Sequence, residues 1–170
     1  SKTDFTRTNG NCFYFVKSAC HFCKSLHITR HMKQFINEIA VSTSGRGFFN
    51  ISSQVKSWVR EQNISIGLLT VFIKHTSASL VIQENADPDV LHDMAVFFKD
   101  LVKDGDTKYR HSLEGPDDMS AHIRTSLTST HLSIPVNAGV PCLGTWQGIF
   151  LFEHRTHAHN RTVVLHLIGE

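Results

Sequence analysis

The chain has 170 residues, 41% of them hydrophobic, and this length suits a single domain with one core. Its 17 Lys and Arg residues and 15 Asp and Glu residues give a formal net charge of +2, which is too small to build the positive field that attracts nucleic acid. No apolar run approaches the ~20 residues that a membrane-spanning helix requires. Nucleic acid and membrane are therefore excluded as expected partners, and a soluble protein is predicted.

Residues 1–31 differ in composition from the rest of the chain. They hold five basic side chains and a single acid, Asp4, and they show no helical or strand period. Such a segment is typical of an organelle transit peptide or of a translated leader outside the fold, so the domain is predicted to span residues 32–170. The alternative is a zinc site, because Cys20 and Cys23 form a CxxC motif with three histidines nearby.

Cysteine usage bears on the compartment. Three of the four cysteines lie in residues 1–31, and only Cys142 lies in the predicted domain, which excludes a disulfide framework there. A reducing compartment is the simpler setting. We therefore expect a cytoplasmic protein, or an organellar one if residues 1–31 are a transit segment.

Hydrophobic periodicity predicts the elements of the domain in chain order. The predicted strands are Lys33–Val41, Phe48–Ile51, Ile64–Ile73, Ala78–Gln83, His131–Val136, Gln147–Glu153 and Thr162–Ile168. The predicted helices run from Ser52 or Ser53 to Asn63, from Asp87 to Val102, and from Asp117–Asp118 to Leu127. Asp87 followed by Pro88 is typical of a helix start, and the β-branched run Ile64–Ile73 indicates a strand buried on both faces.

The order of these elements defines the fold class. Strands and helices share one core, and the helices are too few and too clustered for repeated βαβ crossovers. The predicted fold class is therefore α+β, a mainly antiparallel sheet or sandwich with a few helices packed on it.

Histidine is the unusual feature of the composition, with 12 copies, and it serves as a metal ligand and as a proton carrier near neutral pH. His75 interrupts the end of an apolar strand and precedes two hydroxyls, Thr76 and Ser77, which can donate to carboxylate or phosphate oxygens. A lone histidine at a strand end is equally well explained by a hydrogen bond to the backbone. Asn85 lies in a polar segment just beyond the next strand.

A second polar group falls within twelve residues and consists of His111, Glu114, Asp117, Asp118 and His122. Asp118 and His122 are spaced i, i+4 on one helix face, beside an apolar stripe. Partial burial lowers the pKa of a histidine there while a nearby acid raises it, which favours ligation or proton transfer. We therefore predict His75, Glu114, Asp118 and His122 as catalytic residues; the alternative is an ordinary ion pair on a helix surface.

These residue types also predict a metal. Three neutral imidazoles, those of His75, His111 and His122, would leave a tetrahedral Zn²⁺ with one open position for water. A divalent metal, zinc or magnesium, is the expected cofactor, and Glu114 or Asp118 is the expected proton carrier.

Two further segments predict substrate contacts. The glycines of Gly144–Gly148 permit close backbone approach, and Trp146 could wall a heteroaromatic ligand. Arg155 and Arg161 bracket the last turn, and their planar donors suit the oxygens of a small phosphorylated molecule. The predicted substrate-binding residues are Thr76, Ser77, Asn85, Trp146, Gln147, Arg155 and Arg161. The alternatives are a hairpin anchored by tryptophan and surface arginines without a ligand.

Three long motifs occur in a fixed order: HTSASLVIQENADPDVLHDM at 75–94, YRHSLEGPDDMSAHI at 109–123 and LGTWQGIFLFEHR at 143–155. Together they resemble the YjbQ-like family over residues 33–170. The resemblance implies a compact sheet-and-helix fold, a homotrimer, and a site formed by His75, His111 and His122 with nearby acids.

The resemblance also implies an activity. It is that of a thiamine-phosphate synthase, which joins a pyrimidine pyrophosphate to a thiazole phosphate and releases pyrophosphate. Arg155 and Arg161 could then bind the departing anion. Two alternatives are a metal-dependent hydrolase of a small phosphorylated or acylated metabolite and a protein that binds a ligand or metal without turnover.

Overall fold

Residues 31–170, the part of the chain that the computed structural model describes, form eight strands and three helices. The predicted leader and the CxxC zinc site lie outside these described residues, apart from His31. In chain order the elements are β1 (Lys33–Thr43), β2 (Gly47–Asn50), α1 (Ser52–Glu61), β3 (Ile66–Ile73), β4 (Ala78–Glu84), α2 (Pro88–Leu101), α3 (Asp118–Leu127), β5 (His131–Asn137), β6 (Val140–Pro141), β7 (Gln147–Glu153) and β8 (His159–Gly169). Within residues 31–170 none of the helices has the length and apolar character needed to cross a membrane.

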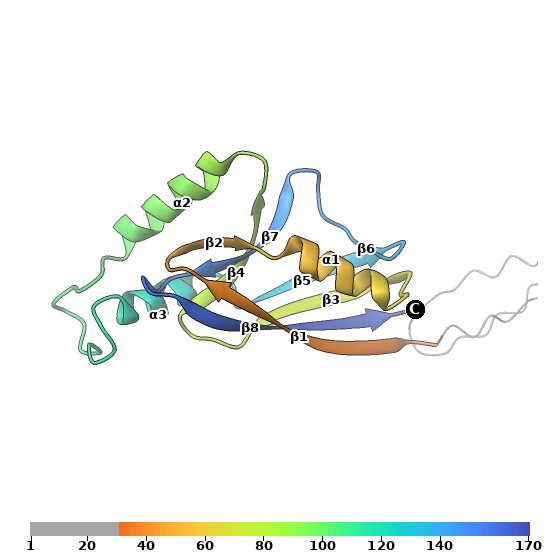
Figure 1. The fold of residues 1–170 in the computed structure, drawn as a ribbon, viewed down its shortest axis with the longest axis horizontal. Coiled ribbons are helices and arrows are strands. Elements are labelled where there is room, and N and C mark those ends of the chain that lie inside the picture. Colours follow the sequence, from red (N-terminus) through yellow and green to blue (C-terminus); the bar gives the residue numbers. More distant parts are fainter. Residues whose placement is uncertain (1–30) are drawn as a thin grey trace, which may run out of the picture.

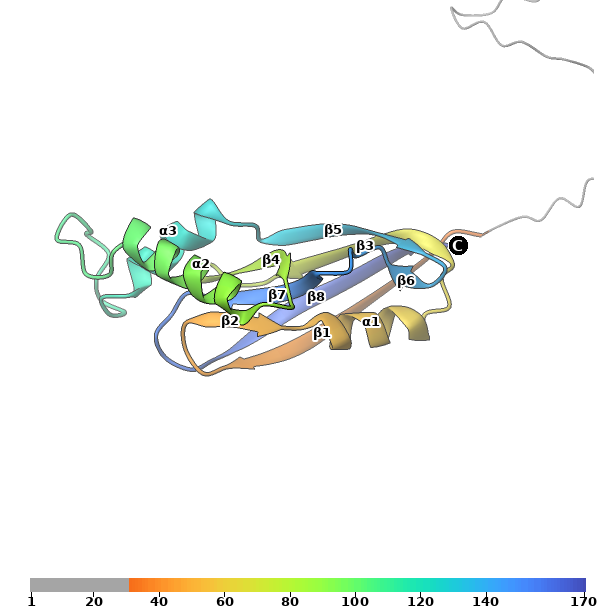
Figure 2. The same cartoon turned by 90° about the horizontal axis from the view of Figure 1, so that it is seen from above.

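Two antiparallel sheets curl around one core (Figures 1 and 2). The larger sheet has the strand order β1-β8-β3-β5-β6 and the smaller has β2-β7-β4. Leu69 and Leu165 of the larger sheet and Ile149 and Leu151 of the smaller sheet are fully buried in one cluster. The predicted α+β class with mainly antiparallel strands is thus confirmed.

Burial on β3 differs from the prediction. Its residues alternate between core and surface, and Leu68 and Phe72 remain 42% and 44% exposed. The helices contact the smaller sheet and the short strand β6, so they do not cover this side of β3. The predicted burial on both faces is therefore wrong, because a β-branched run cannot show which of its faces a helix will cover.

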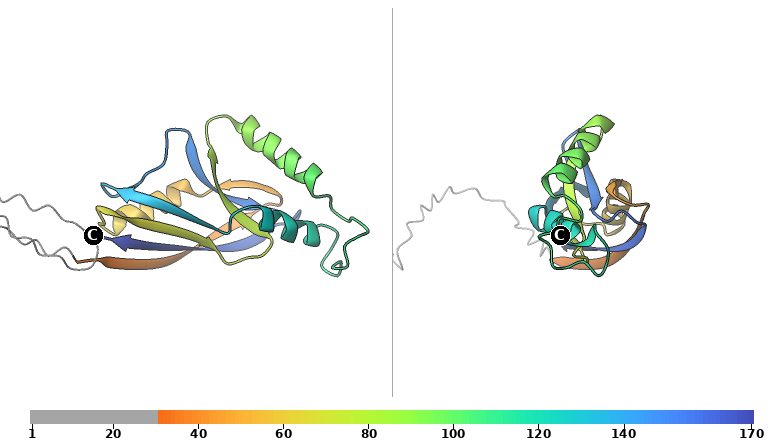
Figure 3. Two further views of the ribbon diagram at one scale, coloured as in Figure 1. Left: turned by 180° about the vertical axis from the view of Figure 1, so that it is seen from behind. Right: turned by 90° about the vertical axis from the view of Figure 1, so that its left-hand side faces the viewer.

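Helix α2 begins as predicted and then packs less than predicted. The side chain of Asp87 accepts a hydrogen bond from the amide of Asp89 at 2.9 Å, and Pro88 occupies the first turn. The helix leads outward from the end of β4 toward α3 (Figure 3). None of its residues is buried. Phe97 is 60% exposed although it belongs to the apolar stripe.

Candidate metal centre

The first turns of α3 and the loop before it bring three metal-ligating side chains together. Asp118 and His122 lie four residues apart on one face of the helix, and His111 comes from the loop between α2 and α3. Nε2 of His111 lies 2.7 Å from Oδ2 of Asp118, and Nε2 of His122 lies 3.3 Å from the same oxygen. One ligand atom from each residue falls within 4.8 Å of the others.

Hydrogen bonding fixes the tautomer of His122. Its Nδ1 lies 2.9 Å from the carbonyl oxygen of Thr76, which can only accept, so Nδ1 carries the proton. In a neutral imidazole Nε2 then presents a bare lone pair, and this lone pair faces the Asp118 carboxylate. Two acceptors at 3.3 Å repel each other unless a second proton or a cation lies between them. A backbone carbonyl on the remote nitrogen is the usual support of a metal-ligating histidine.

Burial distinguishes the three side chains. The Asp118 side chain is only 2% exposed, whereas those of His111 and His122 are 45% and 32% exposed. The carboxylate therefore forms the floor of the group, and the two imidazoles open toward solvent. Two imidazoles and one carboxylate are a ligand set of catalytic zinc sites, which keep a fourth position open. Magnesium prefers oxygen ligands alone, so this set suits it poorly.

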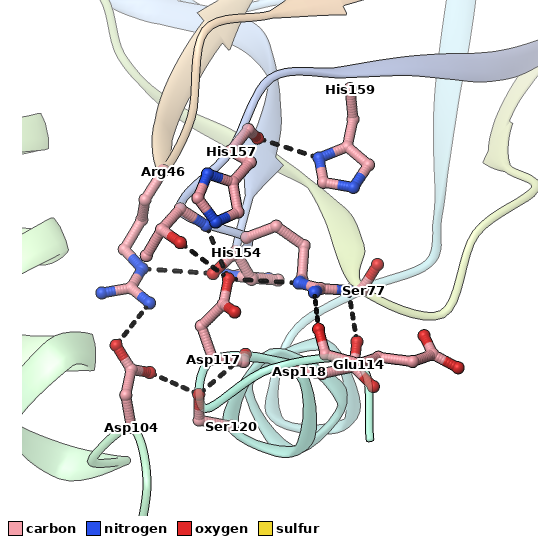
Figure 4. Close-up of polar contacts among 12 residues, drawn as sticks. Arg46, Ser77, Asp104, Glu114, Asp117, Asp118, Ser120, His154, His157 and His159 are labelled. Atoms are coloured by element: carbon pink, nitrogen blue, oxygen red, sulfur yellow. Dashed lines mark hydrogen bonds and ion pairs between the residues drawn. The ribbon is translucent and has the colours of Figure 1, made fainter. Parts of the chain in front are cut away.

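Arg155 binds the oxygen of the Asp118 carboxylate that does not face the two imidazoles. Its Nη1 lies 2.5 Å from Oδ1 of Asp118, its Nε lies 3.1 Å from Oδ2 of Asp117, and its Nη2 donates to the carbonyl oxygen of Glu114 at 2.7 Å. Figure 4 shows Asp117 and Asp118 side by side at the start of α3. The amide and hydroxyl of Thr156 also donate to Asp117, and these bonds outweigh burial and hold the pKa of that carboxyl well below its usual range.

The structure does not bring His75 into this group. Nε2 of His75 accepts a hydrogen bond from the backbone amide of Thr162 at 2.8 Å, so its proton resides on Nδ1 and neither nitrogen offers a free lone pair. Burial first, and then the positive charge of Arg161, lowers the pKa of His75 and favours this neutral form. Asp118, predicted as a catalytic acid, lies with His111 and His122 in the group where His75 was predicted.

Arg161 lies in a buried ion pair. Its Nε and Nη2 lie 2.7 and 2.6 Å from the two oxygens of Glu153, and its Nη2 also donates to the hydroxyl of Ser77 at 3.1 Å. Glu153 is fully buried and also accepts from the hydroxyl of Thr43. Burial would raise the pKa of Glu153, but the hydrogen bonds from Arg161 and from the Arg155 amide lower it below its usual value. Neither Ser77 nor Arg161 is exposed to a ligand in this arrangement.

The remaining predicted substrate contacts fall at two ends of the smaller sheet. Thr76, two residues before the start of β4, contacts His122 through its carbonyl oxygen, and Glu114 is exposed on the ligand loop. Asn85 and Trp146 lie at the far end of β4, where the backbone N–H of Asn85 donates to the Trp146 carbonyl and the Gln147 side chain accepts from the Gly144 amide. The seven residues of β4 separate these ends, a distance of about 20 Å.

A further polar network beside α3 was not predicted. Arg124 is buried and donates to Asp104, which also pairs with Arg46 at 2.8 Å. Close by, His154 is fully buried, its Nε2 lies 2.9 Å from the hydroxyl of Ser79, and its Nδ1 has no partner. Burial, reinforced by Arg124 and other nearby arginines, lowers the pKa of His154 to about 3. The apolar strand before His154 was the only sign in the sequence that this histidine is interior.

Fold and site together define an α+β protein of two curled antiparallel sheets, with a cluster of two histidines and one aspartate at the start of its third helix. The sequence model described as "UPF0047 protein YjbQ-like" matches residues 26–170. The chain belongs to this YjbQ-like UPF0047 family, as the motifs of the sequence predicted.

Relatives and solved structures agree with this assignment. The chain is 52% identical over 132 residues to the UPF0047 protein sll1880 of Synechocystis, covering 78% of this chain and 90% of that protein. It is 42% identical over 133 residues to YjbQ of Escherichia coli O157:H7, covering 78% and 96%. A crystal structure of a YbjQ-like protein of unknown function from Sulfolobus solfataricus P2 is similar with a TM-score of 0.76 and 27% identity, over 82% of this chain and all of that one.

Proposed function

We propose that His111, Asp118 and His122 bind a divalent metal, zinc in the first place, and that the protein is a metal-dependent hydrolase of a small molecule. The observation that carries this proposal is that Nε2 of His111 and Nε2 of His122 converge on one oxygen of a buried carboxylate, within the distance that a single cation can bridge. The three protein ligands leave a position for water or substrate.

Each residue then has a separate part in the chemistry. The metal would polarise the bond under attack and lower the pKa of a water molecule toward neutrality. His111 and His122 would bind through Nε2, and the Thr76 carbonyl orients the His122 ring. Glu114, exposed on the same loop, is the proposed proton carrier in place of Asp118, because Asp118 serves as a ligand.

The charges around the site favour hydrolysis over the thiamine-phosphate synthase activity implied by the family resemblance. A synthase must hold a departing pyrophosphate, which requires free cationic donors. Arg46, Arg124, Arg155 and Arg161 each pair with a carboxylate of this chain, so Arg110, exposed on the ligand loop beside His111, is the arginine near the described site that is open to an anion. One such donor beside the metal suits a single phosphoryl or acyl group better than a departing pyrophosphate.

Elemental analysis tests the ligand set. We expect purified wild-type protein to contain close to one zinc per chain, and we expect His122→Ala and Asp118→Ala to lose it, because each change removes one of three ligands. His75→Ala is the matched control and should keep its metal, since its nitrogens are engaged elsewhere. Loss of metal in His75→Ala with retention in Asp118→Ala would contradict the proposed centre.

Turnover separates the hydrolase from a protein that only binds. A panel of small phosphate and carboxylate esters should be hydrolysed by the metal-loaded protein, and a chelator or His122→Ala should abolish this hydrolysis. Stoichiometric metal without any turnover would favour the non-catalytic alternative. Formation of thiamine phosphate from the two synthase substrates, unaffected by chelation, would restore the family-implied activity.

We also propose that the chain forms a homotrimer, in which copies cover the outer face of α2. Val96, Phe97 and Leu101 are 44–60% exposed on this helix, which has no buried residue. Monomers rarely expose a continuous apolar patch of this kind. Light scattering should give the mass of three chains, and Phe97→Asp should lower it because it places a charge in the contact.

Ile36→Asp provides the control for the assembly. Ile36 is 73% exposed on the larger sheet, far from α2 in the strand order, so its substitution should leave the mass unchanged. A monomeric wild type would reject self-association. A mass that falls with Ile36→Asp and not with Phe97→Asp would assign the contact to the sheet.

A further inference from the structure

The two oxygens of the Asp118 carboxylate face different partners. Oδ1 receives Nη1 of Arg155 at 2.5 Å, whereas Oδ2 faces the ring nitrogens of His111 and His122 at 2.7 and 3.3 Å. The side chain is only 2% exposed, so water does not compete for either oxygen. The carboxylate is therefore divided between a cationic donor on one side and the two imidazoles on the other.

Arg155 is itself fixed at several points. Its backbone amide donates to Oε1 of Glu153 at 3.0 Å, and the other nitrogens of its guanidinium bond Asp117 and the Glu114 carbonyl. Its side chain is 11% exposed. Moving the guanidinium away from Oδ1 would break these bonds as well, so the donor stays in place when the ligands rearrange.

The contact of Arg155 with Oδ1 limits the ways in which Asp118 can coordinate a metal. A carboxylate can bind a metal through one oxygen or through both, and the second mode occupies an additional position. A catalytic zinc with three protein ligands works because one position stays open for water or substrate. A guanidinium on Oδ1 competes directly with the metal for that oxygen.

We propose that Arg155 is a positioning residue that restricts Asp118 to one metal-binding oxygen and so keeps a coordination position open. The inference rests on the proposed metal centre and adds the control of its coordination number. Arg155 touches neither metal nor substrate in this role. It acts through Asp118 alone, and its bonds to Asp117 and Glu114 keep it aligned.

Cobalt substitution reads out the coordination number, because d–d absorption of Co²⁺ weakens as the number of ligands rises. Wild-type protein saturated with Co²⁺ should show the intense bands of a four-coordinate ion. Arg155→Met should bind Co²⁺ ~10–100-fold more weakly, as expected when an outer-shell partner of a ligand is lost. At saturating Co²⁺ its bands should also be weaker and shifted, because the freed Oδ1 joins the metal.

Arg46→Met is the matched control. The Arg46 side chain is 15% exposed, pairs with Asp104 and donates to the His154 carbonyl, and contacts none of the three ligands. Its removal should leave the Co²⁺ spectrum unchanged, whatever it does to stability. An equal spectral change in Arg46→Met would overturn the inference, because it would show general loosening of the fold.

The experiment distinguishes failure of the metal centre from failure of the role proposed for Arg155. If wild-type protein binds no Co²⁺, the metal centre itself is rejected. If it binds Co²⁺ and Arg155→Met at saturation gives the wild-type spectrum, the centre stands and the role of Arg155 is overturned. Should Arg155→Met not fold, Arg155→Gln keeps a polar side chain without the cation, and the same weakened bands are expected; an unchanged spectrum again overturns the inference.

Discussion

Replacing Arg161 by methionine is expected to lower the free energy of unfolding by about 3–5 kcal/mol, the usual cost of removing one partner from a buried ion pair. Glu153 is fully buried and would lose two charge-assisted hydrogen bonds. Its remaining partners, the Thr43 hydroxyl and the Arg155 amide, are neutral and cannot balance a buried charge. Urea unfolding at pH 7 measures the effect.

A double variant separates the pair from its parts. Glu153→Gln removes the charge and keeps an acceptor for the Thr43 hydroxyl, so Arg161→Met combined with Glu153→Gln should recover a large part of the loss. A single Arg161→Met variant as stable as wild type would mean that Arg161 is free to bind a ligand, as the sequence suggested. If the double variant loses as much unfolding free energy as Arg161→Met alone, the loss comes from packing and not from an unpaired charge.

The fold was largely predictable because its signals are local. Period-two alternation in β8 and β1 and the Asp87–Pro88 start of α2 each follow from residues close together in the chain. Packing between distant elements was not predictable in this way. The apolar stripe of α2 indicated a buried helix, yet no residue of α2 is buried in the single chain. An apolar stripe indicates that one face of a helix packs against something, but it does not identify the element or chain that packs there.

The candidate site was predicted only where its residues lie close together in the chain. The i, i+4 spacing of Asp118 and His122 fixes their shared face, and the structure brings them together with His111. His75 fails to join them because its ring is engaged by the amide of Thr162, a residue 87 positions away. Arg155 and Arg161 were predicted to donate hydrogen bonds to a substrate phosphate, because the sequence does not reveal the carboxylates that pair with them.

Acidification from pH 7.5 to 4.5 is expected to cost the wild-type protein on the order of 2–3 kcal/mol of stability through His154 alone. Burial lowers the pKa of His154 to about 3, against 6.5 for an ordinary histidine. Between these values the unfolded chain binds a proton that the folded chain excludes. The contribution is therefore fully present above pH 6.5 and is lost as the pH falls toward 3. Urea unfolding with a chelator present, at several pH values, measures this slope.

His154→Gln isolates this contribution. Glutamine can still bond the Ser79 hydroxyl and cannot take up a proton in this range, so the variant should be less stable at pH 7.5 yet lose less stability on acidification. His75 also has a lowered pKa, but it is present in both proteins and cancels in the comparison. Carboxylates with lowered pKa values, such as Glu153, act mainly below this window, because their unfolded pKa values lie near 4. Equal slopes for the two proteins would show that His154 takes up a proton in the folded state, which would require water or a charge at its unpartnered Nδ1.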